Sequence, residues 1–129
     1  MDHGGLETDY TTMPVPGKVG AAQLHFHFME KYEMDEEQAE ALVASSSRSL
    51  NEFFSGADSL LNKRIQAIEE DEVKALAHRG KGLFLIMGQD EWALYVAALS
   101  GSSKNTIHDN LRMLVKYIRQ SFSDIILIG

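Results

Sequence analysis

The chain has 129 residues and a mass of 14.4 kDa, which suits one compact domain and is too little for two. Its 12 Lys and Arg are outnumbered by 19 Asp and Glu, and no basic tract is present that would bind a nucleic-acid backbone. The absence of cysteine excludes disulfide bonds and thiolate metal sites. No apolar run approaches the roughly 20 residues of a membrane span, and the N-terminal residues lack a secretory pattern. We therefore expect a cytoplasmic protein that binds neither nucleic acid nor membrane.

Residues 1–19 contain both prolines, several glycines and few large apolar groups. We expect a flexible leader there, ordered only if it docks on the remaining domain, residues 20–129. Over 21–32, apolar residues recur at every fourth position: Leu24, Phe28 and Tyr32. This spacing predicts a short amphipathic helix. The alternation that includes Phe26 would also fit a strand, but no second strand is evident to pair with it.

A capping box formed by Asp35 and Gln38 predicts the start of a long helix, because each side chain can satisfy a free amide of the first turn. One apolar stripe then continues to about Ile68 at spacings of three, four and seven residues. The serine-rich stretch 45–49 and Gly56 are poor helix formers. The sequence therefore leaves open whether this helix is continuous, bent or broken.

Three more helices are predicted, over 72–87, 89–99 and 103–122. Asp71 is placed to cap the first of them, and Gly88 is placed to end it. The short connections make neighbouring helices antiparallel. The predicted fold is therefore all-α, an up-and-down four-helix bundle with an additional N-terminal helix.

The 72–87 helix carries the most informative residues. With about 100° of rotation per residue, its apolar positions share one face. That face contains Val73, Leu76, Ala77, Gly80, Leu83, Phe84 and Met87. His78 falls on the other side, near Lys74, Lys81 and Gly82. We therefore expect the His78 ring to face solvent.

This arrangement suits phosphoryl chemistry. A neutral imidazole nitrogen is a nucleophile, and Lys81, one turn after His78, offers a cation to an incoming anion. Gly82 removes the side chain that would cover the next turn, although glycine inside a helix costs about 1 kcal/mol. Phosphoryl transfer depends mostly on positioning and on stabilising charge, and both can be supplied here.

The run from Ala77 to Gly82, Ala-His-Arg-Gly-Lys-Gly, with Gly88 further on, resembles the signature of histidine-containing phosphotransfer (HPt) domains. The resemblance covers roughly residues 35–122. It implies a cytoplasmic helical bundle in a multistep two-component phosphorelay. Such a bundle accepts a phosphoryl group from an aspartate of one receiver domain and passes it to another.

The resemblance also implies roles for single residues. His78 would accept the phosphoryl group through Nε2, Lys81 would stabilise it, and Gly82 would give the receiver access. Gly80 departs from the family pattern, which usually has a large apolar core residue two positions after the histidine. We expect this departure to weaken the local helix and to leave the chemistry of His78 unchanged.

A carrier of this kind is not an enzyme, and no acidic metal pocket or nucleotide loop is evident beside His78. We expect no cofactor, because Mg²⁺ would belong to the receiver. The expected partners are response-regulator receiver domains and a hybrid histidine kinase. Four residues are predicted to form their docking patch: Lys74, Arg79, Leu85 and Ile86. Lys74, Arg79 and Lys81 would also compensate the roughly 1.5 to 2 negative charges that phosphorylation adds.

Two other hypotheses compete with the carrier. The first is a helical adaptor that binds a receiver or a histidine kinase without being phosphorylated. The second is a metal site at His25 and His27, which is disfavoured because positions i and i+2 point to different sides of a helix and no third ligand accompanies them. The apolar tail, residues 125–128, is predicted either to fold back on the bundle or to pair with another copy.

Overall fold

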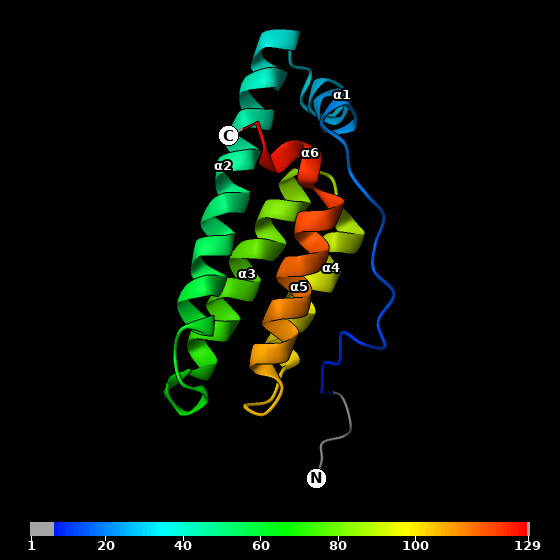
Figure 1. Ribbon diagram of the computed structural model, residues 1–129. Helices are drawn as coiled ribbons and strands as arrows, with labels where there is room; N and C mark the ends of the chain where they lie inside the picture. Colours follow the sequence, from blue (N-terminus) through cyan, green and yellow to red (C-terminus); the bar gives the residue numbers. More distant parts are fainter. Residues whose placement is uncertain (1–6, 129) are drawn as a thin grey trace.

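Residues 7–128 are described by a computed structural model, and within them six α-helices and two short 3-10 helices occur without any strand. Figure 1 shows four helices side by side: α2 (Glu36–Leu61), α3 (Glu70–Ile86), α4 (Asp90–Ala97) and α5 (Ile107–Ser121). Two more, α1 (Ala21–Tyr32) and α6 (Ser123–Ile126), lie at the end where α2 projects beyond the others. The predicted all-α bundle is confirmed. No described helix has the length and hydrophobicity that crossing a membrane requires.

Helix α1 has the predicted bounds, and Leu24 and Phe28 are buried on its inner side. Helix α2 begins with the predicted capping box. The backbone N–H of Gln38 donates to Asp35 Oδ1 over 2.8 Å, and the N–H of Asp35 donates to Gln38 Oε1 over 3.1 Å. Both elements therefore follow from local sequence signals.

Helix α2 continues without a break through its serine-rich stretch. The hydroxyl of Ser46 donates to the carbonyl of Leu42, and that of Ser47 donates to the carbonyl of Ile126 in α6. The Ser46 hydroxyl shares the Leu42 carbonyl with the helical backbone, whereas the Ser47 hydroxyl bonds outside its own helix, to α6. The helix ends at Leu61, earlier than the predicted Ile68. Ile68 is still buried, but it follows the 3-10 helix η1 (Ile65–Ala67).

Helix α3 begins two residues earlier than predicted. Its N-cap is Glu69, which forms a capping box with Glu72, so the predicted cap Asp71 lies inside the first turn. The reciprocal contact between Glu69 and Glu72 satisfies two free amides, which a lone Asp71 cap would not do. At the other end Gly88 has a φ of 73°, which confirms its predicted role in ending the helix.

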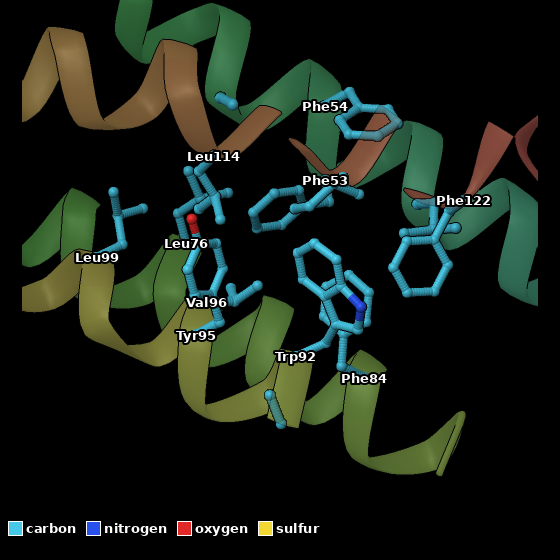
Figure 2. Packing of buried hydrophobic residues seen from close by; sticks show 14 of the residues in the cluster. Phe53, Phe54, Leu76, Phe84, Trp92, Tyr95, Val96, Leu99, Leu114 and Phe122 are labelled. Atoms are coloured by element: carbon cyan, nitrogen blue, oxygen red, sulfur yellow. The ribbon is translucent and has the colours of Figure 1, made fainter. Parts of the chain in front are cut away.

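The core lies between α2, α3, α4 and α5 (Figure 2). Trp92 is 1% exposed, and its ring lies 5.3 Å from that of Phe122 and 6.0 Å from that of Phe84. Trp92 and Tyr95 are therefore core residues, and they fix the face that α4 turns toward the bundle. Helix α4 continues into the 3-10 helix η2 (Ala98–Gly101).

The N-terminal strap, residues 7–20, is docked on the bundle, which is the condition under which we expected the leader to be ordered. The Tyr10 hydroxyl donates to the carbonyl of Tyr95 over 2.7 Å, and the Trp92 indole donates to that of Gly17 over 2.9 Å. Further along, the N–H of Val19 donates to the carbonyl of Ser121. Residues 1–6 of the expected leader lie outside the described part of the chain.

The apolar tail folds back on the bundle, which is one of the two predicted alternatives. Helix α6 packs against α2, and Ile125 is fully buried. Leu127 remains 86% exposed, so only the first half of the tail contributes to the core. The α6 contact also explains why Ser47 is buried, since its hydroxyl bonds the Ile126 carbonyl.

Candidate functional site

Helix α3 places His78 on its outer face. Lys74, Lys81 and Gly82 are exposed with it, whereas Val73, Leu76, Ala77, Gly80 and Phe84 are buried on the opposite face. Leu83, predicted to be buried, is half-buried. The helical phase read from the apolar spacing therefore puts the imidazole in contact with solvent.

A shallow pocket of about 320 Å³, called the His78 pocket below, lies beside this ring. It is lined by Lys74, Ala77, His78, Lys81, Ala97 and Ser100. Helix α3 supplies the first four residues, and α4 with η2 supplies the last two. Ala97 and Ser100 were not predicted from the sequence, because neither residue type carries a chemical signal. Only the antiparallel pairing of the two helices brings them to His78.

The polar groups of the His78 pocket are mostly cationic. The Ser100 hydroxyl donates its hydrogen to the Ala97 carbonyl over 2.9 Å. Lys74 Nζ lies 3.6 Å from Glu70 Oε2, and Lys81 has no ion-pair partner within residues 7–128. The pocket therefore offers two ammonium groups beside one imidazole, which is a setting for an anion.

Gly82 leaves open space above this pocket. A Cβ atom added at Gly82 would meet no other atom within 4 Å. Side chains of a helix lean toward its N-terminus, so a side chain at Gly82 would extend over the turn that carries His78. The missing side chain thus keeps one approach to the imidazole clear.

Gly80 has the opposite surroundings. A Cβ atom added there would lie 2.5 Å from Val96 Cγ1 and 2.7 Å from Phe53 Cε1. The expectation that Gly80 merely weakens the local helix is therefore incomplete. Phe53 of α2 and Val96 of α4 supply the apolar bulk at this position, and the glycine lets both helices approach α3 closely.

The residues predicted to dock a partner do not form one cluster. Arg79 turns toward α2, where its Nη2 atom lies 3.3 Å from the place that a Cβ of Gly56 would occupy. It lines a separate pocket of about 260 Å³ between α2 and α3, together with Ser49, Glu52, Phe53, Leu83 and Ile86. Lys74 and Lys81 line the His78 pocket on the side of α3 that faces α4 and η2, whereas Arg79 lies on the side that faces α2.

The outer surface around His78 has exposed apolar side chains. Leu85 is 46% exposed and Ile86 is 51% exposed, both on the C-terminal half of α3. Leu94 of α4, which was not predicted from the sequence, is 69% exposed and lies one turn before Ala97 of the pocket wall. Its position opposite the buried Trp92 and Tyr95 on the α4 wheel was the signal available in the sequence.

His25 and His27 make separate contacts. His25 Nε2 lies 3.2 Å from the carbonyl oxygen of Glu36, and the His27 ring packs directly on Gly88. Across residues 7–128, no group of three or more His, Asp or Glu side chains is placed to hold a metal ion. Within that range, His27 Nε2 is buried and has no hydrogen-bond partner.

No protein-family model, no curated protein and no solved structure matches this chain.

Proposed function

We propose that this protein is a histidine phosphotransfer protein of a multistep two-component phosphorelay, with His78 as the phosphoacceptor. The observation that carries the proposal is the exposed imidazole in a pocket that it shares with Lys74 and Lys81. The open space at Gly82 supports it, because a large partner must reach the ring. The resemblance of residues 77–82 to the HPt signature points the same way.

In this reaction the lone pair of His78 Nε2 attacks the phosphorus atom of an aspartyl phosphate on a receiver domain. The P–N bond forms while the bond between phosphorus and the carboxylate oxygen breaks, which returns a free carboxylate to the receiver. A neutral imidazole attacks through a lone pair, so the step needs no base to remove a proton from Nε2. Lys81 stabilises charge on the phosphoryl oxygens, and the receiver brings its own Mg²⁺. Transfer onward is the same step in reverse.

The receiver would dock on exposed apolar side chains of α3 and α4: Leu85 and Leu94 on the side of the His78 pocket, and Ile86 at the groove between α2 and α3. Large apolar side chains that are this exposed can form the contact with a partner protein. Arg79 would contact the partner from the groove between α2 and α3. As in the family it resembles, the protein would act in the cytoplasm, between a hybrid histidine kinase and receiver domains.

The test is transfer from a phosphorylated receiver. The protein should take up an acid-labile, base-stable label, and His78→Gln should abolish it while circular dichroism shows an unchanged helix content. His25→Gln is the matched control, since it alters a histidine on α1 and should keep the label. Label that survives His78→Gln would exclude this site.

A helical adaptor is the second candidate, because the exposed Leu85, Ile86 and Leu94 would bind a receiver or a kinase without any chemistry. It predicts no label with any cognate receiver and equal binding of receivers to the unaltered protein and to His78→Gln. Measuring receiver affinity alongside the label therefore separates the two functions.

A further inference from the structure

The acidic residue Glu70 begins a charged column on the outer face of α3. Glu70, Lys74 and His78 follow one another at intervals of four residues, so they stand in line on one side of the helix. Lys74 Nζ lies 3.6 Å from Glu70 Oε2, and their side chains are 57% and 70% exposed. An ion pair this exposed contributes at most about 1 kcal/mol, so a stronger anion can replace Glu70.

The composition of the His78 pocket leaves few groups that could hold an anion on the ring. Ala77 and Ala97 have no polar side chain, and the Ser100 hydroxyl already donates to the Ala97 carbonyl. Lys74 and Lys81 are the remaining donors. Because side chains of a helix lean toward its N-terminus, the direction expected for His78 is over the turn of Lys74, and that expected for Lys81 is back toward the ring.

We infer that Lys74 is a second phosphoryl-binding group of this site, held by Glu70 until His78 is phosphorylated. The inference rests on the proposed function, and it adds a regulator of how strongly the carrier retains its phosphoryl group. A phosphoryl group brings about 1.5 to 2 negative charges, more than the single charge of the Glu70 carboxylate. Lys74 then moves from the Glu70 carboxylate to the phosphoryl oxygens. Glu70 reduces the stabilisation that Lys74 gives the phosphoryl group, because the ion pair between Lys74 and Glu70 must break first.

The readout is the equilibrium constant for phosphoryl exchange between His78 and a receiver aspartate. It is measured by phosphorus NMR at protein concentrations below the dissociation constant of the complex. This constant depends only on the free reactants and products, so a mere change in docking leaves it unaltered. Lys74→Ala should shift it toward the receiver by about three- to tenfold, and Lys74→Arg should restore most of the loss. Lys116→Ala on α5 is the matched control, since it removes the same charge from an exposed lysine outside the pocket.

Glu70→Gln should shift the constant in the opposite direction, toward His78. In the double variant Glu70→Gln with Lys74→Ala, most of this shift toward His78 should disappear, because the effect of Glu70 acts through Lys74. Equal constants for Lys74→Ala and Lys116→Ala would overturn the inference and leave the proposed function standing. Failure of the unaltered protein to take label on His78, either from the receiver or from phosphoramidate, would overturn both.

Discussion

Gly80 and Gly82 lie two residues apart on α3 and face opposite surroundings. At Gly80 an added Cβ would meet Val96 and Phe53 at 2.5 and 2.7 Å, whereas at Gly82 it would meet nothing within 4 Å. The rotation of the helix between the two positions turns one toward the core and the other toward solvent. The same residue type thus lets helices pack closely on one face and leaves the imidazole open on the other.

The two glycines also differ in what offsets their cost. Each weakens the helix by about 1 kcal/mol relative to alanine. At Gly80 the close packing of α2 and α4 on α3 compensates that cost. At Gly82 no contact within the described residues compensates the lower helix propensity of glycine. A destabilising residue without such compensation is typical of a functional position.

The largest effect is expected from Gly80→Ala. The added methyl group must displace Val96 or Phe53, both of which are buried, and overpacking of this kind destabilises by about 1–3 kcal/mol. The free energy of unfolding, measured with urea, should fall by that amount in spite of the better helix propensity of alanine. Unchanged or increased stability would show that the core around α3 is loose and would remove the contrast between the two glycines.

Gly82→Ala should have the opposite sign. Its methyl group enters open space, so only the gain in helix propensity remains, and the free energy of unfolding should rise by about 1 kcal/mol. Thermal and urea unfolding both measure this change.

Gly82→Leu sharpens the same comparison for function. Its side chain would extend over His78, so transfer from a receiver should slow far more than labelling by the small donor phosphoramidate. Equal slowing for both donors would mean that Gly82 does not serve the access of a large partner.

The sequence predicted those features that depend on contacts within one helix. The bounds of α1, the capping box of Asp35 and the role of Gly88 are local, and the exposed face of His78 follows from the phase of α3 alone. The task of Gly80 and the pocket wall at Ser100 depend on which helices meet α3, and a single sequence does not contain that information. The pocket that Arg79 shares with residues of α2 depends on helix packing in the same way.

Helix α4 also has one covered side and one exposed side. The strap covers its inner residues, where Tyr10 contacts Tyr95 and Gly17 accepts from Trp92. Its outer side carries Leu94 and Ala97, next to the His78 pocket. The strap also holds η2, because the Thr8 N–H donates to the Gly101 carbonyl and the Thr8 hydroxyl donates to that of Ala98. The strap therefore holds in place the two elements, α4 and η2, that form one wall of the His78 pocket.

An effect no larger than that of Gly82→Ala is expected where the strap meets α4. Tyr10→Phe removes the hydrogen bond to the Tyr95 carbonyl, so the free energy of unfolding at pH 7 should fall by about 1 kcal/mol. Burial raises the pKa of the Tyr10 phenol well above its ordinary value of 10.0, and burial also raises the pKa of Tyr95, to about 12. Above about pH 10 the unfolded chain therefore loses phenol protons that the folded protein retains, and stability falls as the pH rises.

Because Tyr10→Phe lacks one of these two phenols, its stability should fall less steeply above pH 10 than that of the unaltered protein. The difference between the two proteins should narrow as the pH increases, which urea unfolding at a series of pH values measures. Stabilities that decline in parallel would show that Tyr10 titrates alike in the folded and unfolded chain. In that case Tyr10 would not be buried against Tyr95, and the strap would be held on α4 and η2 by its contacts at Thr8 and Gly17.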